Sequence, residues 1–201
     1  MATAEPSGTV AFDAVVLAGG RARRMGGADK PGERVGGRAL VALVADAAAA
    51  ARRLVIVGPP RPEPAHAVFV REEPPGAGPV PALRAGLSEV SAPWVALLAG
   101  DLPFLRPGDV AALLVAARDA DAAGAVLLDG DGREQWLAGC WRTGGLRRAL
   151  TCYAGASLRG LLGPLDPVKV SLPAGERPPW YDCDTPGELE HAERLAGPHG
   201  P

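Results

Sequence analysis

A run of glycines and cations between Leu17 and Lys30 is the part of this sequence with the clearest chemical use. It reads LAGGRARRMGGADK, so two glycine pairs bracket three arginines and a lysine closes the run. Glycines let backbone N–H groups turn toward an anion, and the cations add positive charge. The run matches neither the G-K-[ST] phosphate loop nor the G-x-G-x-x-G fingerprint, and a solvated loop is the alternative. Because it directly follows an apolar run, where connections are normally short, we predict that it binds a triphosphate.

Three aspartates are candidate ligands for a divalent cation. Asp101 follows the apolar run WVALLA, and Asp182 and Asp184 precede a strong helix-start signal. Mg²⁺ prefers a sparse oxygen site that waters and phosphates complete. The alternatives are that Asp101 caps the turn before Pro103 and that the other two aspartates compensate a helix dipole. We predict that Asp101 holds Mg²⁺ or Mn²⁺ together with Asp184, and Asp182 stays open as the replacement for Asp184.

The bulk composition excludes several classes of protein. The 201 residues carry a net charge of −2, so no overall basic surface points to nucleic acid. The N-terminus lacks the basic start of a signal peptide and no apolar run has the length of a membrane span; we therefore predict a cytoplasmic protein without membrane contact. Cys140, Cys152 and Cys183 are spaced too widely to indicate a disulfide framework or a zinc site. Only two of the 21 cations are lysines, Lys30 and Lys169.

The elements that must position these residues follow from hydrophobic period and from glycine and proline punctuation. Short apolar runs predict strands at 12–18, 54–57, 67–70, 94–99, 125–128, 136–141 and 168–172. Helical patterns cover 38–53, 81–90, 107–120, 146–153, 158–162 and 186–195. The last of these helices is the best marked, because Thr185 and Glu188 form a capping box around Pro186.

Short apolar strands that alternate with helices predict an α/β fold with three layers and a mostly parallel sheet. We expect one domain at residues 12–196, with loose tails at 1–11 and 197–201. Ligands of open parallel sheets bind at the carboxyl ends of the strands. The glycine run and Asp101 both follow predicted strands, so we expect them at the same edge of the sheet.

The glycine run also resembles a known signature. LAGG-x-A-x-R-M-G-G-x-D-K is similar to the loop of molybdenum cofactor guanylyltransferases, within the wider MobA-like nucleotidyltransferases. Three later segments agree in order: EEPPGAGPVPALRAGL at 72–87, GDLPF at 100–104 and DTPGEL at 184–189. The resemblance covers about residues 12–195. One departure is GPVPAL at 78–83, where the family usually has G-P-L-x-G-L, and another is the absence of asparagine from this chain.

The resemblance implies a three-layer Rossmann-like nucleotidyltransferase that moves GMP from Mg-GTP onto the phosphate of molybdopterin and releases pyrophosphate. Its partners would be GTP, molybdopterin and the molybdoenzyme or cofactor-delivery protein that receives the product. Two alternatives stay open. One is a related transferase that uses CTP on molybdopterin or GTP on another phosphorylated acceptor. The other is a non-catalytic delivery protein that binds nucleotide and cofactor.

Site residues also follow from the resemblance. Lys30 would bind the phosphates and Asp101 would hold the metal. The charge that must be neutralised, and not the resemblance, adds Arg24 of the Arg21–Arg24 cluster to the catalytic group. The nucleotide contacts would come from Leu17, Ala18, Gly19, Gly20, Arg21, Lys30, Gly58, Glu73, Gly78 and Asp101. Glu73 is one of a pair with Glu72, and the resemblance fits either member.

Residues near the acceptor are less distinctive. Gln135 and Trp136 fall where relatives have a segment near the acceptor, although packing is the simpler role for a tryptophan. Arg147, Arg148 and Arg159 would form either a basic rim for the pterin phosphate or a plain solvated face.

Overall fold

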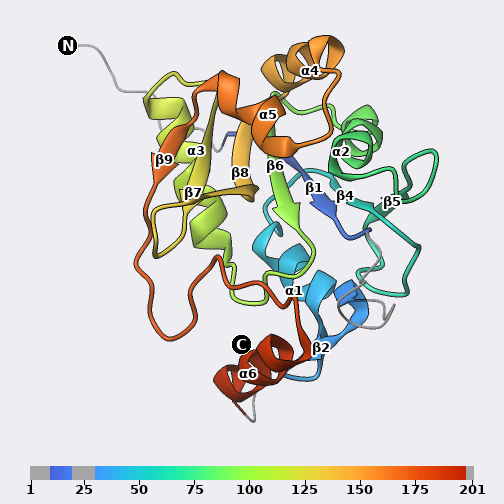
Figure 1. Ribbon diagram of the computed structural model, residues 1–201, viewed down its shortest axis with the longest axis vertical. Helices are drawn as coiled ribbons and strands as arrows, with labels where there is room; N and C mark the ends of the chain where they lie inside the picture. The colour runs from blue at the N-terminus through green and yellow to red at the C-terminus, as the bar shows by residue number, and fades with distance from the viewer. Residues whose placement is uncertain (1–9, 20–29, 198–201) are drawn as a thin grey trace.

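The computed structural model describes residues 10–19 and 30–197. The predicted roles of Gly20, Arg21 and Arg24 therefore lie outside the described residues, as does most of the two predicted tails. Within the described part, a sheet of seven strands is covered by helices on both faces (Figure 1). The predicted α/β fold with a mostly parallel sheet is confirmed.

The sheet has the strand order β5-β4-β1-β6-β8-β7-β9. The strands are β1 (Phe12–Leu17), β4 (Leu54–Val57), β5 (Val68–Val70), β6 (Trp94–Ala99), β7 (Gly124–Leu128), β8 (Glu134–Arg142) and β9 (Val168–Val170). β8 runs antiparallel to β6 and to β7, and the other neighbouring strands of this sheet pair in parallel. The carboxyl ends of β1, β4 and β6 therefore meet at one edge.

Helices form the two outer layers. They are α1 (Leu40–Ala47), α2 (Pro79–Ser88), α3 (Pro107–Asp119), α4 (Thr143–Cys152), α5 (Leu158–Leu162) and α6 (Pro186–Ala196). Short 3-10 turns lie at η2 (Lys30–Gly32) and η3 (Gly163–Leu165), and β2 (Arg34–Val35) pairs with β3 (Arg38–Ala39) in a small hairpin. Figure 1 shows α6 beside this hairpin, away from the main sheet.

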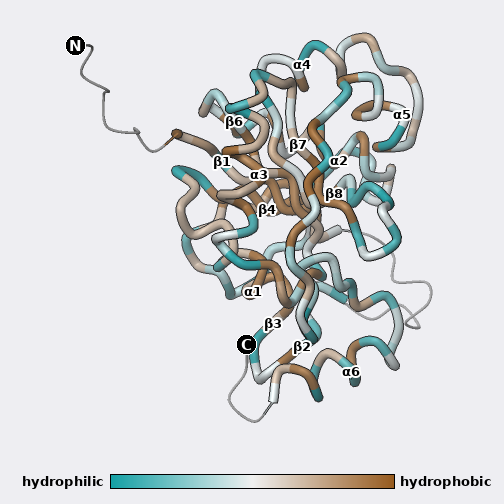
Figure 2. Tube along the Cα trace, turned by 90° about the vertical axis from the view of Figure 1, so that its left-hand side faces the viewer, coloured by the Kyte–Doolittle hydropathy of each residue, from teal (hydrophilic) through white to brown (hydrophobic). Residues whose placement is uncertain are grey.

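Two cores explain why the central strands are continuous apolar runs. Alternate residues of β1 point to opposite faces, so that Val16 packs with α1 and α3 while Val15 packs with α2, α4 and α5. In Figure 2 the brown, hydrophobic trace is concentrated in the strands between the helical layers. A strand buried on both faces is a continuous apolar run in the sequence. The ends of such a run can be read directly, and β4 and β6 therefore have the predicted bounds.

The predicted helix at 38–53 is wrong at both ends. Arg38 and Ala39 belong to β3, and α1 ends at Ala47. The Arg52 backbone N–H donates to the carbonyl of Phe12 at 2.9 Å, so the chain has already turned to enter β4. Sheet pairing thus overrides the helix propensity of the alanine run. Smaller differences are that α2 begins at Pro79 and α4 at Thr143.

Among the described residues, no helix is long and apolar enough to cross a membrane. The cytoplasmic location stays a prediction. Cys140, Cys152 and Cys183 are free thiols, and only Cys152 is exposed.

Candidate active site

The start of the glycine run is held tightly at the carboxyl edge of the sheet. The Ala18 N–H donates to the Val57 carbonyl at 2.9 Å. A Cβ on Gly58 would come within 2.6 Å of the Ala18 carbonyl oxygen, and one on Gly100 would come within 3.0 Å of the Ala18 Cβ. The segment that leads into the run is therefore packed between two glycines that end β4 and β6. Gly58 is buried against this backbone, whereas Gly19 is exposed.

One residue that helps to hold this segment, Arg61, was not predicted from the sequence. Arg61 donates from its guanidinium to the Pro59 carbonyl at 3.2 Å and to the Ala18 carbonyl at 3.4 Å. It therefore ties the loop after β4 to the beginning of the glycine run. Arginines are common in this chain, so nothing in the sequence marks this one.

A cavity of about 390 Å³, here called the glycine pocket, opens next to this segment. Its lining includes Leu17, Gly19, Glu72, Gly76, Gly78 and Asp101. Gly76 and Gly78 have positive φ angles of 79° and 111°, a backbone region that favours glycine. These two positions let the chain between β5 and α2 fold around the pocket.

Glu72 gives the glycine pocket a buried carboxylate. Its residue is 5% exposed, and its Oε1 accepts a hydrogen bond from the Gly76 N–H at 2.7 Å. Its Oε2 is buried and has no hydrogen-bond partner within the described residues. The predicted nucleotide contact of Glu73 is not supported by its placement, because Glu73 is exposed and the pocket lining contains Glu72. The hydrogen bond from the Gly76 N–H holds the Glu72 side chain at the pocket, while its neighbour Glu73 is exposed.

Lys30 and two aspartates come together beside the glycine pocket. The Lys30 Nζ pairs with Asp101, which follows β6, and with Asp184, which precedes α6. Burial alone would lower the pKa of Lys30, but the charge and hydrogen bond of Asp101, aided by Asp184, outweigh it and raise that pKa. The ammonium therefore stays charged, and three segments distant in sequence are joined by one cation.

The second aspartate of the acidic pair lies close by. Burial, followed by the charges of Asp184 and Asp101, raises the pKa of the Asp182 carboxyl. Among the described residues, no group of three or more histidine, cysteine, aspartate or glutamate side chains is arranged as a metal site. Two carboxylates that already share a cation nevertheless suit Mg²⁺, which needs few protein ligands when phosphates and waters supply the rest.

A second cavity of about 600 Å³, here called the tryptophan pocket, is also lined by Asp101. The rest of its lining includes Gln135, Trp136, Arg159, Asp182 and Asp184. It shares Pro79, Ala99, Asp101 and Leu137 with the glycine pocket. The two cavities therefore adjoin along these four residues, and Asp101, which follows β6, contributes to both.

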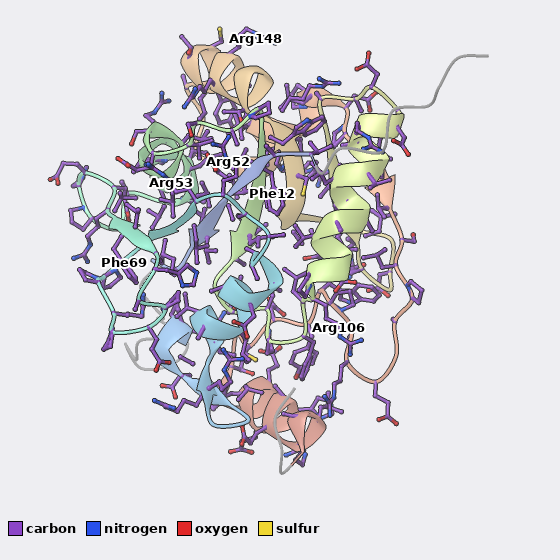
Figure 3. The ribbon with its side chains drawn as sticks, turned by 180° about the vertical axis from the view of Figure 1, so that it is seen from behind. Phe12, Arg52, Arg53, Phe69, Arg106 and Arg148 are labelled. Atoms are coloured by element: carbon purple, nitrogen blue, oxygen red, sulfur yellow. The ribbon has the colours of Figure 1, made fainter. Side chains whose placement is uncertain are left out.

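Only some of the residues predicted to lie near the acceptor line the tryptophan pocket. The Gln135 amide donates to the Asp129 carboxylate at 2.8 Å, which fixes its orientation. Arg159 lines the pocket, but Arg147 donates to the Leu87 and Val90 carbonyls at 3.0 and 2.7 Å, at the end of α2. Arg148 lies at the outer surface of α4 (Figure 3). The structure thus brings one of the three arginines of the predicted rim to this pocket.

Known proteins resemble the chain over nearly its whole length. The model of the MobA-like NTP transferase domain family matches residues 14–168. A molybdenum cofactor guanylyltransferase from Bradyrhizobium sp. (strain ORS 278) is 33% identical over 203 residues, which cover 94% of this chain and 95% of that protein.

Solved structures share the fold at lower identity. Molybdopterin-guanine dinucleotide biosynthesis protein A from Archaeoglobus fulgidus is 18% identical with a TM-score of 0.71, covering 91% of this chain and 97% of that one. 2-C-methyl-D-erythritol 4-phosphate cytidylyltransferase from Thermus thermophilus is 23% identical, also with a TM-score of 0.71, covering 92% and 98%. The same fold thus occurs in proteins named for guanine and for cytidine nucleotides.

Proposed function

Because the chain belongs to the MobA-like NTP transferase family, and within it to the molybdenum cofactor guanylyltransferases, we propose that it transfers GMP from GTP to the phosphate of molybdopterin. The observation that supports this most directly is the pair of cavities that meet at Asp101. One would hold the nucleotide and the other the acceptor, so that the two reacting phosphates face each other across the Asp101 carboxylate.

The chemistry needs little beyond positioning and charge. A phosphate oxygen of the acceptor attacks the α-phosphorus of GTP, the bond from that phosphorus to the bridging oxygen breaks, and pyrophosphate leaves. A phosphate monoester is already ionised at neutral pH, so no general base is required. The barrier comes from bringing two anions together, and fixed positive charge lowers it.

Lys30 and Asp101 would carry this charge control. The Lys30 ammonium, whose pKa is raised mainly by Asp101 against the effect of burial, would neutralise the phosphates of the donor. Asp101 with Asp184 would hold Mg²⁺, or Mn²⁺ in its place. The metal, when bound, supplies positive charge to the phosphates and to the departing pyrophosphate.

Glu72 supports guanine as the base. Glu72 lines the glycine pocket and its Oε2 is a buried acceptor without a partner among the described residues, and an unmet buried acceptor carries a free-energy penalty. Guanine presents two adjacent N–H donors on its pairing edge, N1–H and the 2-amino group, which match one carboxylate. Cytosine has a single amino donor beside an acceptor nitrogen, so it matches a pair of carboxylate acceptors less well than guanine does.

The tryptophan pocket would take the acceptor. Trp136 offers an aromatic face to a flat heterocycle, the Gln135 amide is held in place by Asp129, and Arg159 adds a cation for a phosphate. We further propose that the product then passes to a molybdoenzyme or a delivery protein, and that the protein works in the cytoplasm.

The deciding experiment is to incubate the protein with each of the four nucleoside triphosphates, Mg²⁺ and molybdopterin, and to identify the dinucleotide by mass. We expect the guanine dinucleotide and stoichiometric pyrophosphate. A preference for CTP would overturn the guanylyl assignment, and GTP binding without pyrophosphate release would overturn the enzymatic one. Glu72→Gln should raise the KM for GTP about tenfold or more and narrow the preference over CTP, whereas Glu73→Gln is the matched control that should change neither.

A further inference from the structure

Lys30 occupies the carboxylates that the proposed function also needs for a metal. Its Nζ pairs with Asp101 and Asp184, and the Lys30 and Asp101 side chains are 14% and 19% exposed. An ammonium and a divalent cation compete for these two carboxylates, because both draw on their oxygen lone pairs and their charges repel at short range. Metal binding at these two aspartates is therefore expected to move Lys30.

We propose that Lys30 is a resident counter-cation of the Asp101–Asp184 pair, that a divalent cation displaces it, and that this displacement delivers the ammonium to the nucleotide phosphates. The inference rests on the proposed function for the metal role of the two aspartates. It is independent of which base and which acceptor the enzyme uses.

Charge balance favours exchange over coexistence. Two carboxylates and the ammonium leave one net negative charge, whereas two carboxylates and a divalent cation leave none. The adjacent Asp182, an exposed residue that also lines the tryptophan pocket, adds to the excess of negative charge in the metal-free state. The pairs are partly buried, so an unbalanced charge there is costly. Lys30 therefore compensates part of the carboxylate charge until a divalent cation, which has twice its charge, replaces it.

Exchange also couples the metal to the nucleotide. A metal that binds alone must break both ion pairs of Lys30 and leave the ammonium without a partner. A metal that arrives with a triphosphate brings the anion that the released ammonium then pairs with. Lys30 directly follows the glycine run in sequence, which is the segment predicted to bind the phosphates. Metal and nucleotide should therefore bind with positive coupling.

The chain offers a matched control, because Lys30 and Lys169 are its two lysines. Lys169 pairs with Glu134 at 2.8 Å and its side chain is 56% exposed. Mn²⁺ binding to the full chain without nucleotide would be measured from the loss of the free Mn²⁺ signal in electron paramagnetic resonance. We expect Lys30→Met to bind Mn²⁺ about tenfold more tightly than the unmodified chain, and Lys169→Met to bind it as the unmodified chain does.

A double variant and a melting-temperature measurement test the same exchange independently. Asp101→Asn added to Lys30→Met should abolish the gain, and Mn²⁺ should raise the melting temperature of Lys30→Met more than that of the unmodified chain. If Lys30→Met is unfolded without metal, Lys30→Gln takes its place in the titration. Equal or weaker Mn²⁺ binding by these variants would overturn the exchange.

The two proposals fail separately. If the unmodified chain makes the guanine dinucleotide but loss of Lys30 leaves Mn²⁺ affinity unchanged, the exchange is wrong and the proposed function stands. If loss of Lys30 tightens Mn²⁺ binding while no triphosphate is turned over, the exchange stands and the proposed function is wrong.

Discussion

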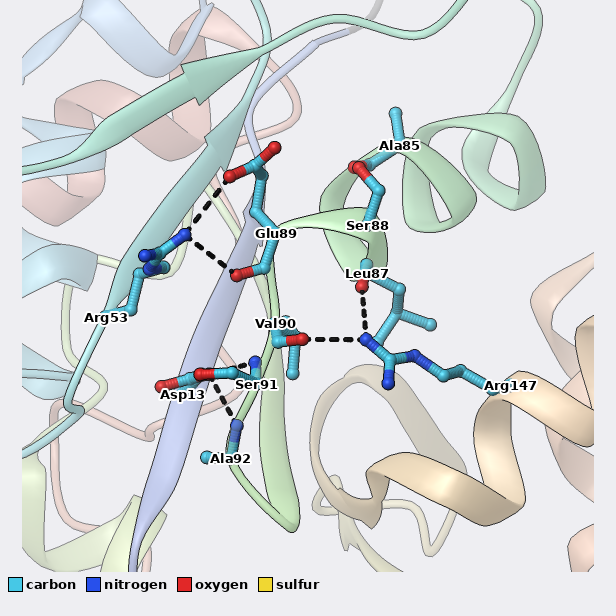
Figure 4. Close-up of polar contacts among 10 residues, drawn as sticks. All are labelled: Asp13, Arg53, Ala85, Leu87, Ser88, Glu89, Val90, Ser91, Ala92 and Arg147. Carbon is cyan, nitrogen blue, oxygen red and sulfur yellow. Dashed lines mark hydrogen bonds and ion pairs between the residues drawn. The ribbon is translucent and has the colours of Figure 1, made fainter.

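The two ends of the sheet use the same types of charged residue in opposite ways. At the amino ends of β1 and β6, Asp13 is 1% exposed and its Oδ2 accepts hydrogen bonds from the N–H groups of Ser91 and Ala92 at 2.7 and 2.8 Å (Figure 4). At the carboxyl ends, Asp101 faces the ammonium of Lys30. A backbone donor cannot leave its acceptor while the fold persists, but a side-chain ammonium can. The first aspartate is therefore structural and the second is available for chemistry.

The cations divide in the same way. Arg147 donates to the Leu87 and Val90 carbonyls, and Arg53 donates to the Glu89 carbonyl at 3.2 Å and to its carboxylate at 3.1 Å (Figure 4). These carbonyls end α2, where a helix carries partial negative charge. The arginines at this end of the sheet thus close a helix terminus, whereas Lys30 sits between two carboxylates beside two cavities. Position along the strand, more than residue type, separates structure from function.

The largest effect that would test this contrast is expected for Asp101→Ala. Loss of this carboxylate should lower guanylyl transfer by on the order of 10³-fold or more, because the metal loses a ligand and Lys30 loses the partner that holds it before the metal binds. Pyrophosphate release at saturating Mg-GTP measures it, and circular dichroism checks that the fold is intact. Unchanged turnover would remove Asp101 from the mechanism.

Lys30→Ala should follow, with a loss of on the order of 10²–10³-fold in kcat/KM. Lys30→Arg should recover little, since a planar guanidinium does not replace a compact ammonium at the nucleotide phosphates. The same pyrophosphate assay applies, with Lys169→Ala as the control that should keep its rate. A loss of equal size in the Lys169 variant would show that lysine charge in general, not this position, matters.

At the opposite end of the sheet, Asp13→Ala should affect stability and leave catalysis intact. It strips the Ser91 and Ala92 N–H groups of their acceptor and should lower the free energy of unfolding by about 2 kcal/mol. Urea denaturation measures this change, and kcat/KM of the folded variant should match that of the unmodified chain. A fall in kcat/KM without a change in stability would contradict the division between the two ends.

Arg147→Ala should have a smaller effect of the same kind. The carbonyls of two buried residues at the end of α2 lose a charged donor, but Arg147 itself is exposed and water can take its place, so we expect a loss of about 1 kcal/mol. Thermal unfolding would detect it. A rise in the KM for the acceptor would instead return Arg147 to the basic rim of the pterin phosphate.

The smallest effect concerns thiol reactivity. Burial raises the pKa of Cys140 and that of Cys183 to about 12, so both thiols should stay protonated and unreactive at pH 8. Labelling of the folded chain with a thiol reagent should modify one cysteine, Cys152, and labelling in denaturant all three. Rapid modification of Cys183 in the folded chain would mean that the segment carrying Asp184 opens more readily than its packing indicates.

Sequence reasoning succeeded wherever local pattern and tertiary demand agree. β4 and β6 are buried on both faces, so their apolar runs end where the sheet ends, and the capping box of Thr185 and Glu188 marks the start of α6 as predicted. It failed at 38–53, because alanine-rich sequence favours helix wherever the chain permits and only the pairing with neighbouring segments shows that it does not. Glu72 and Glu73 are chemically alike in sequence, so their assignment depended on the turn.

The family and the fold class could be inferred from motifs and hydrophobic patterns along the chain. The residues near the ends of β1 and β6 could be inferred from chain order, because a residue just after a parallel strand must lie at the carboxyl edge of the sheet. The packing of remote segments was needed to show that Lys30 pairs with both Asp101 and Asp184, the latter 154 positions away, and that the buried carboxylate lining the glycine pocket is Glu72. Those pairings depend on how α6 and the turn before α2 pack, and distances between remote segments leave no periodic trace in the sequence.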